Sequence, residues 1–534
     1  MKRLPVAPLG LIRAAFLRLE AWLNAAFGAN NPFYHLGSLG FQSFYIMVGS
    51  GLYLIIYYEP TVLGSYDKLQ YLTREQWYLG GIMRSLHRYA ADSMVLVMAL
   101  HILREFVKGR YRGPRWFSWV TGIPVLILVY VTGIEGLWMV WDKLAQFLVE
   151  RTSEWVDWLP IIGSLMARNF LTSADVADIF FRMLIIIHIA LPLFLGAFLL
   201  LHIKKVSRAG ILPPRGLALG ALGALVLLSL IHPTVSQDRA DFGIAAGVVH
   251  PDWFYMFFYP LMDVWSMGAV WALVVGLTGL LTVLPWLPPK RPEPIAKVSL
   301  ENCNGCGFCA ADCPYEAITL QPRSDNRPHA VREAVVIADN CVGCGICAGA
   351  CPFSMPFRRV EVLETGIDLP QRNVQHLLDA TREALAKVSK SPRILVYGCD
   401  HGVDVTSLSL PDTAAVSLPC IGALPPSFIP AALRYGADGI LLTGCRQGDC
   451  YHRLGDEWVR ARLHTGRRPS LRRSVDRSRI GLCWAAPPDR QELLRALETL
   501  RKSLQDRRHT SERKRQRGEP FAEENRRETL RDLM

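Results

Sequence analysis

The stretch that decides the fold is GIMRSLHRYAADSMVLVMALHILR, residues 81–104, an apolar run long enough to cross a bilayer. It carries two histidines, His87 and His101, which are 14 positions apart. On an α-helix, 14 residues turn through about 1,400°, only about 40° less than four full turns, and rise by roughly 21 Å. Both imidazoles therefore lie near one face of the expected helix, with one toward each membrane surface.

A second apolar run, residues 178–203, repeats this arrangement with His188 and His202, again 14 positions apart. Buried histidines are costly in membrane helices, so four at matched spacing indicate function more than satisfied core histidines. Two such helices packed antiparallel would supply two stacked sites with two imidazoles each. Neutral imidazole is an axial ligand of haem iron. The pattern predicts two haem sites: His87 with His188, and His101 with His202.

Four glycines repeat the same spacing in the neighbouring apolar runs. They are Gly37 and Gly51 in the first run, and Gly122 and Gly136 in the third. A bulky macrocycle wedged between helices needs missing side chains where its edge meets the backbone, at the depth of each histidine. The glycines therefore support the haem sites, although small residues also serve plain helix packing.

Six apolar runs are long enough to span a membrane. They lie at about 39–58, 81–103, 117–140, 178–203, 216–233 and 262–287. The loops after the second and fourth runs are rich in Lys and Arg, which predicts that they and both termini face the cytosol. Residues 1–30 are expected to form an amphipathic helix on the membrane surface, or one packed on protein.

The net charge of +12 does not indicate nucleic-acid binding, because no recognition motif accompanies it. The basic residues lie mainly between apolar runs and near the C-terminus, where topology and a solvated tail explain them. No nucleic-acid partner is expected.

Two cysteine runs follow the membrane part: CNGCGFCAADCP at 303–314 and CVGCGICAGACP at 341–352. This C-x2-C-x2-C-x3-C-P spacing is typical of two [4Fe–4S] clusters, with the fourth cysteine of each run reaching the other cluster. One expected ligand set is Cys303, Cys306, Cys309 and Cys351. The other is Cys341, Cys344, Cys347 and Cys313. The third and fourth cysteines of each run argue against zinc. Such thiolates must stay reduced, which also favours the cytosol.

A third soluble part contains three strand-like segments that end near cysteines. These segments are PRILVYGC, AVSLPC and DGILLTGC, and the cysteines are Cys399, Cys420, Cys445 and the following Cys450. Alternating strands and helices predict a small parallel α/β domain, whose strand ends are where such sheets build sites. The spacing alone allows a further cluster or merely free structural cysteines.

Residues 31–290 resemble the cytochrome b of quinol-oxidising (cytochrome bc-type) complexes. The resemblance rests on RxxH at Arg84–His87, HxxR at His101–Arg104, HxxxP at His188–Pro192, and the segment HPDWFYMFFYP. It implies two haem b groups, with Arg84 and Arg104 beside them, and quinone sites near each membrane surface. The last segment is similar to the family's Pro-Glu-Trp-Tyr motif at the outer site.

Two departures from the family lie around that outer site: Asp252 and Phe254 replace its Glu and Tyr, and MVW follows Gly136 in place of Leu-Pro-Trp. Asp252 is a candidate proton carrier there, or a loop acid that caps a helix. Lys204 and Lys205 are candidate proton groups of an inner quinone site, or residues that only set topology.

Residues 391–505 resemble the delta subunit of methyl-viologen-reducing hydrogenase, through CIG, GADG and GCRQGDCYH. The resemblance implies one [2Fe–2S] cluster on Cys399, Cys420, Cys445 and Cys450. It also implies a cytosolic flavoprotein partner resembling the flavin subunit of heterodisulfide reductase. A further family cysteine is replaced here by Gly402, and Cys483 lies outside the pattern.

The expected fold class is multidomain: an α-helical transmembrane bundle of about six spans, a bacterial-type 2[4Fe–4S] ferredoxin α+β domain and a small parallel α/β domain. The expected boundaries are 1–30 surface helix, 31–290 cytochrome b-like domain, 291–365 ferredoxin domain, 366–390 linker, 391–505 hydrogenase delta-subunit-like domain and 506–534 charged tail.

The resemblances predict a membrane-bound electron-transfer subunit between a cytosolic redox partner and the quinone pool. It would serve as the quinone-reactive part of an oxidoreductase complex with other subunits, in the lipid of a prokaryotic cytoplasmic membrane. Two alternatives remain. One is quinol oxidation that drives reverse transfer to a low-potential acceptor, and the other is a haem-containing anchor without a quinone site of its own.

Overall fold

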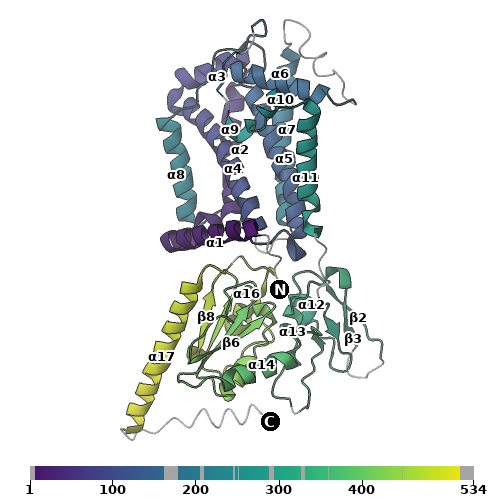
Figure 1. The fold of residues 1–534 in the computed structure, drawn as a ribbon, viewed down its shortest axis with the longest axis vertical. Helices are drawn as coiled ribbons and strands as arrows, with labels where there is room; N and C mark the ends of the chain where they lie inside the picture. The colour runs from purple at the N-terminus through teal and green to yellow at the C-terminus, as the bar shows by residue number, and fades with distance from the viewer. Residues whose placement is uncertain are drawn as a thin grey trace. The chain divides into compact units, whose positions relative to one another are not determined.

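The computed structural model describes residues 7–160, 178–204, 210–244, 247–250, 252–287, 294–325, 331–358, 360–447 and 449–516. The chain divides into two compact units, Met1–Lys290 and Arg291–Met534. The first unit is helical, and the second contains three small β-sheets with helices (Figure 1). The predicted fold class, a helical membrane part followed by a ferredoxin-like part and a parallel α/β part, is confirmed.

All six predicted apolar runs contain helix. The long helices are α2 (Leu36–Tyr57), α4 (Ile82–Val107), α5 (Trp116–Trp138), α7 (Asp178–Ile203), α8 (Arg215–Ile231) and α11 (Met267–Val283). Among the described residues, four helical segments are long and apolar enough to cross a membrane: Leu36–Tyr57, Gly113–Trp138, Asp178–Ile203 and Met267–Trp286. Helix α4 carries more charged side chains, and α8 is shorter.

The sixth run differs from the prediction, because it is not one continuous helix. A short helix, α10 (Leu261–Val264), ends before Trp265, and the side chain of Ser266 then accepts a hydrogen bond from the backbone N–H of Ala269. This N-cap starts a new helix, so the membrane-length segment begins at Met267 instead of 262.

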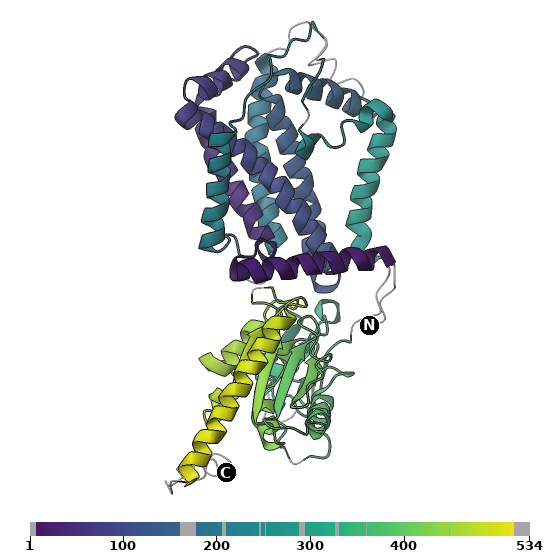
Figure 2. The same ribbon diagram turned by 60° about the vertical axis from the view of Figure 1, so that its left-hand side comes forward.

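The centre of the membrane unit is built from two helix pairs, α2 with α4 and α5 with α7, while α8 packs beside α4 and α11 beside α5. Figures 1 and 2 show α8 and α11 on opposite sides of this central group. A buried apolar cluster lies between the four central helices and includes Phe41, Met94, Val125 and Leu195. Two shorter helices, α3 (Gly64–Arg74) and α6 (Lys143–Asp157), lie at one end of the unit.

Helix α1 (Ala7–Phe27) lies across the other end of the unit (Figure 2). Its Glu20 is fully buried and accepts hydrogen bonds from Arg104 and Lys108 of the α4 end, whereas Leu11 and Trp22 are exposed. Helix α1 therefore binds the end of α4 through these charged contacts, while part of its apolar surface remains exposed. This arrangement suits the predicted surface helix, of which residues 1–6 lie outside the described part.

The second unit begins with two antiparallel ladders, β1 (Lys297–Val298) with β4 (Ile367–Asp368), and β2 (Ile318–Pro322) with β3 (Arg332–Val336). Two short helices, α12 (Phe308–Asp312) and α13 (Ile346–Ala350), each begin two residues after the second cysteine of a ferredoxin run, Cys306 and Cys344. Strand β4 lies inside the segment predicted as a linker. The ferredoxin-like part therefore extends past residue 365.

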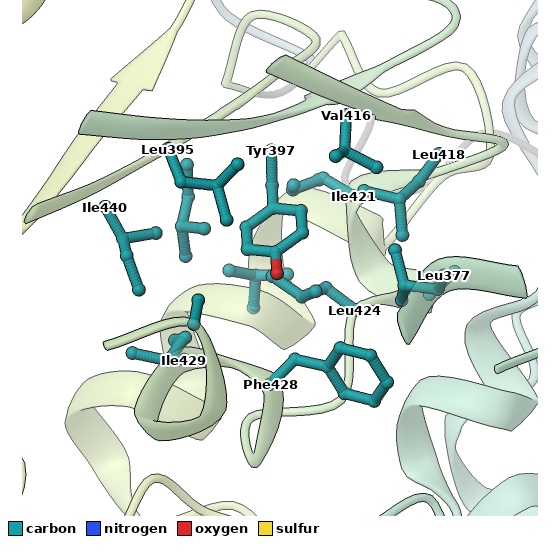
Figure 3. Packing of buried hydrophobic residues seen from close by; sticks show 14 of the residues in the cluster. Leu377, Leu395, Tyr397, Val416, Leu418, Ile421, Leu424, Phe428, Ile429 and Ile440 are labelled. Carbon is teal, nitrogen blue, oxygen red and sulfur yellow. The ribbon is translucent and has the colours of Figure 1, made fainter. Parts of the chain in front are cut away.

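The parallel sheet has the order β6-β5-β7-β8, with β5 (Ile394–Cys399), β6 (Thr413–Leu418), β7 (Gly439–Gly444) and β8 (Ile480–Trp484). All three ladders are parallel. One face is covered by α14 (Val374–Ala386) and α15 (Phe428–Arg434), and Figure 3 shows Tyr397 packed there among Leu377, Leu424 and Phe428.

Two boundary predictions fail on this packing. Helix α14 is not a free linker, because Leu377, Leu378 and Leu385 are buried against the sheet. Helix α17 (Arg490–Gln516) covers the other face through Leu493, Leu497, Leu500 and Leu504 and continues into the segment predicted as a tail. Both helices carry apolar side chains at helical spacing, which binds them to the sheet whatever the charge of their outer faces.

Candidate functional site

The structure pairs the four membrane histidines across α4 and α7. The ring centres of His87 and His188 are 6.3 Å apart, and those of His101 and His202 are 6.4 Å apart. The first histidine of α4 meets the first of α7, and the last meets the last. These two helices therefore run parallel, and the expectation that they pack antiparallel was wrong. Successive spans cross a membrane in opposite directions, so the second and fourth spans run in the same direction.

The separation of the rings fits one metal ion between each pair. With metal–imidazole bonds of about 2 Å and ring centres about 1.1 Å behind the ligating nitrogens, two imidazoles on opposite sides of one ion would have centres about 6.2 Å apart. Both observed separations agree with this value. The two pairs also share the same helices, so they form two sites of one kind at different depths.

The four spaced glycines each face one of these imidazoles. A Cβ atom added at Gly51 would lie 3.1 Å from Cε1 of His87, and one at Gly136 would lie 3.0 Å from Cε1 of His188. The corresponding distances are 3.1 Å for Gly122 and His202, and 3.9 Å for Gly37 and His101. The glycines therefore make room for the imidazole rings themselves, whereas the sequence prediction placed them beside the edge of the macrocycle.

Hydrogen bonds hold the Nδ1 atoms of three of the rings. Nδ1 of His87 is 3.0 Å from the carbonyl oxygen of Met47, Nδ1 of His202 is 3.3 Å from the hydroxyl of Thr121, and Nδ1 of His188 is 2.6 Å from the carboxylate of Glu135. A proton on Nδ1 that is donated to such an acceptor leaves the lone pair on Nε2 for a metal. This arrangement is the usual second layer of contacts around a histidine ligand.

The arginines expected beside the haems are buried and bonded to protein. Arg84 donates to the hydroxyls of Thr73 and Ser236, and Arg104 donates to Glu20 and Glu105. The structure therefore shows structural roles for both guanidinium groups. Their contact with a haem remains a prediction.

The tentative quinone-site residues divide into three cases. Asp252 accepts a hydrogen bond from the N–H of Phe254, which caps α9 (Trp253–Met256), and it forms an ion pair with Arg88. The capping alternative is thus present in the structure. Lys204 is exposed at the end of α7, and Lys205 lies outside the described residues.

The cysteines of the two ferredoxin runs gather in the two groups expected from their spacing. A small cavity is lined by Cys313, Cys341, Cys344 and Cys347. The other group is Cys303, Cys306, Cys309 and Cys351, whose thiols influence one another electrostatically. Each run contains a glycine in the left-handed region, Gly307 and Gly345, just before its helix.

Burial disfavours the thiolate form of these cysteines when no metal is bound. It raises the pKa of Cys309 to about 12, with smaller contributions from the other thiols of its group, and it raises the pKa of Cys344 to about 12. A bound iron cluster would supply the positive charge that a buried thiolate needs. Both groups therefore fit a cluster better than they fit free thiols.

Four further cysteines form a closed ring at the carboxyl ends of the parallel strands. Cys399 contacts Cys420 and Cys445, and Cys450 contacts the same two thiols. The sulfurs of Cys399 and Cys445 are 4.0 Å apart, and all four residues are buried. Hydrogen bonds from Cys420 and Cys445 hold the pKa of Cys399 well below its usual range.

This ring lies where the sheet topology favours a site. Strands β5 and β7 are neighbours, but the chain continues from β5 to β6 on one side and from β7 to β8 on the other. Such a switch point leaves a crevice at the carboxyl ends of the two strands. The family's further cysteine has no space here, because a Cβ atom at Gly402 would lie 3.0 Å from the backbone of Gly444.

One arginine connects the cysteine ring to the ferredoxin-like part. Arg462 is buried and donates to the carboxylate of Asp312 at 2.5 Å and to the carbonyl of Gly422 at 2.9 Å. Asp312 precedes Cys313, and Gly422 follows Cys420 by two residues. The guanidinium of Arg462 therefore links Asp312, beside the ferredoxin cysteine Cys313, with Gly422, beside the ring cysteine Cys420.

The sequence reasoning missed Glu135, Asp312 and Arg462. Glu135 had a usable signal, since a carboxylate within an apolar run is costly and therefore informative. Asp312 and Arg462 had none, because they are 150 positions apart and nothing in either local pattern indicates contact.

Comparison with known proteins divides the chain in the same way. Residues 26–210 match the family cytochrome b/b6/petB, residues 302–355 match the 4Fe-4S dicluster domain, and residues 395–506 match the delta subunit of methyl-viologen-reducing hydrogenase. A solved structure described as a hyperthermophilic respiratory Complex III contains a similar chain, with 21% identity over 48% of this chain and 75% of that one, and a TM-score of 0.39.

These matches confirm the resemblances drawn from the motifs, and they imply haem b and 4Fe-4S clusters in a membrane protein that transfers electrons. The chain joins a cytochrome b/b6 domain, a 4Fe-4S dicluster domain and a domain of the methyl-viologen-reducing hydrogenase delta-subunit family.

Proposed function

We propose that this chain passes electrons between a cytosolic redox partner and the membrane quinone pool, using three iron–sulfur centres and two b haems. The observation that carries the proposal is the pair of matched bis-histidine sites on α4 and α7, with ring separations of 6.3 and 6.4 Å. When bound, haems and clusters accept and release single electrons. The protein's part is to hold them in fixed positions.

The contacts of the second unit support an order among its three centres. Helix α13, which carries Cys347, packs so closely on the turn after Cys420 that a Cβ atom at Gly349 would lie 2.3 Å from the carbonyl oxygen of Gly422. The cysteine ring therefore adjoins the group that contains Cys313 and Cys347. We place that group between the ring and the group of Cys303, Cys306, Cys309 and Cys351.

We infer the orientation and the partner from patterns in the sequence. Basic loops and reduced thiolates both favour the cytosol for the second unit, in a prokaryotic cytoplasmic membrane. The hydrogenase delta-subunit match favours a flavoprotein as the partner that exchanges electrons with the cysteine ring. The haem held by His101 and His202 would then lie nearest the cytosolic surface and connect the clusters with quinone.

We assign quinone reduction to the cytosolic surface because Asp252, the candidate proton carrier of the outer site, is engaged in contacts within the protein. Asp252 is committed to capping α9 and to an ion pair with Arg88, so it is less free to move protons. Lys204 is exposed on the cytosolic side of α7 and can supply protons there. The engagement of Asp252 also favours a second candidate function. If the cytosolic site carries out no quinone chemistry either, the chain is a haem-containing anchor.

Quinone-linked turnover of the purified full chain tests the proposal. Clusters reduced by a low-potential donor should reduce a quinone analogue in nanodiscs, and an inhibitor of the cytosolic site should stop this reaction while an outer-site inhibitor has little effect. Inhibition by the outer-site compound alone would support quinol oxidation and reverse transfer instead. Absence of any quinone reaction, with both haems present, would leave the anchor function.

A further inference from the structure

Glu135 is a carboxylate buried in an apolar helix. It lies in α5, only 6% of it is exposed, and its Oε2 atom is 2.6 Å from Nδ1 of His188. Its Oε1 atom is also buried and has no hydrogen-bond partner within the described part of the chain. A carboxylate with one unsatisfied oxygen costs free energy in such a place, so simple packing does not account for it.

Glu135 has polar equivalents at two of the other three histidines, since Leu36 holds this position before Gly37, which faces His101. Glu135 directly precedes Gly136, which faces His188, just as Thr121 precedes Gly122, which faces His202. Ser50 stands in the same relation to Gly51, and its hydroxyl is 3.1 Å from Nδ1 of His87. Two of these equivalent positions hold neutral hydroxyls, whereas the third places a carboxylate against its imidazole.

A carboxylate that accepts the Nδ1–H of a histidine ligand makes the imidazole a stronger electron donor. The stronger donor, and the negative charge in a medium of low dielectric, both favour the ferric over the ferrous state of a bound iron. Hydroxyl and carbonyl partners have a weaker effect because they are neutral. Glu135 contacts the His87/His188 pair. Glu105 interacts electrostatically with the His101/His202 pair, but its charge is balanced by ion pairs with Arg104 and Arg110.

We propose that Glu135 is a positioning residue that lowers the reduction potential of the haem held by His87 and His188 relative to the haem held by His101 and His202. The inference rests on the proposed function, because it requires haem at both histidine pairs. The asymmetry would make electron transfer between the two haems directional, since an electron on the Glu135 side is held less tightly.

The test is a spectroscopic redox titration of the full chain, comparing wild type with Glu135→Gln. Glutamine keeps the length and one acceptor oxygen but removes the negative charge. The ferric-to-ferrous ratio of one haem at a fixed potential should fall at least tenfold, a shift of about +59 mV for a one-electron couple, while the other haem is unchanged. Two haems of wild-type potential in this variant would overturn the inference.

A second pair of variants assigns the shift and covers loss of haem. In a His101→Ala background only the His87/His188 haem should remain, so Glu135→Gln must move that single titration step. If Glu135→Gln fails to bind haem, Thr121→Glu supplies the reciprocal test, and it should lower the potential of the His101/His202 haem. An unchanged potential there would refute the inference. Thr121→Val serves as the control and should leave the His87/His188 haem unaffected.

The outcomes separate this inference from the proposed function. A wild-type chain without two low-spin haems would remove the basis of both. If both haems are present but their potentials do not change when Glu135 or Thr121 is replaced, only the role of Glu135 is refuted.

Discussion

Replacing Asp312 with alanine should loosen the contact between the ferredoxin-like part and the cysteine-ring domain. The carboxylate is 2% exposed and accepts hydrogen bonds from Arg462 at 2.5 Å and from Arg467 at 2.9 Å. Removing one partner of a buried ion pair costs about 3–5 kcal/mol, because the remaining charge stays buried without compensation. Arg467 is partly exposed, so solvent screens its share and Arg462 dominates the effect.

Hydrogen exchange on the full chain measures this loss. If the contact opens as a unit, about 3–5 kcal/mol corresponds to exchange faster by a factor of roughly 10²–10⁴ in segments 346–350 and 420–423. Asp476→Ala is the matched control, because Asp476 pairs with Arg507 at an exposed site and such pairs contribute about 0–1 kcal/mol. Iron content of the same samples distinguishes loss of the contact from loss of a cluster. Equal exchange in the two variants would refute the role of Asp312.

Three further predictions concern the metal sites and pH. His101→Ala should remove one b haem and leave the other spectrally intact, and retention of both haems would contradict the pairing with His202. Wild type should contain about ten non-haem iron atoms per chain, and Cys445→Ser should lose about two of them together with one EPR signal. Unchanged iron content in the variant would mean that the four-cysteine ring holds no iron–sulfur cluster. Zinc bound to the ring would instead indicate a tetrahedral zinc site. Burial raises the pKa of Asp368 to about 6, so the folded state binds a proton that the unfolded state releases, and stability should fall as pH rises from about 4 to 6. Asp368→Asn should flatten that fall in thermal unfolding at about pH 4 and pH 6, whereas an unchanged slope would point to another group.

The sequence predicted the metal-binding patterns well because each depends on a rigid local period. Fourteen residues of helix fix the faces and depths of His87 and His101, and the ferredoxin spacing depends on turns that glycines permit at Gly307 and Gly345. The strand ends at Cys399 and Cys445 could be predicted for a similar reason, since parallel strands bring their carboxyl ends to one edge.

What depends on contacts distant in sequence was not predictable. The parallel direction of α4 and α7 is an exception, because it follows from counting the crossings along the sequence; the antiparallel expectation was an error of reasoning. The contacts between the ferredoxin-like part and the α/β domain include the ion pair of Arg462 with Asp312, which has no local signature in the sequence. The same holds for α14, whose apolar face binds the sheet although the surrounding segment is charged enough to suggest a linker.

The most direct test of electron transfer from the clusters through the haems to quinone is a rapid-mixing experiment on the full chain in quinone-loaded nanodiscs. Clusters reduced by a low-potential donor should reduce haem first and quinone afterwards in wild type. In His101→Ala, with cluster content unchanged, quinol formation should fall at least tenfold. Quinol formed at the wild-type rate in that variant would contradict the proposed route through the His101/His202 haem.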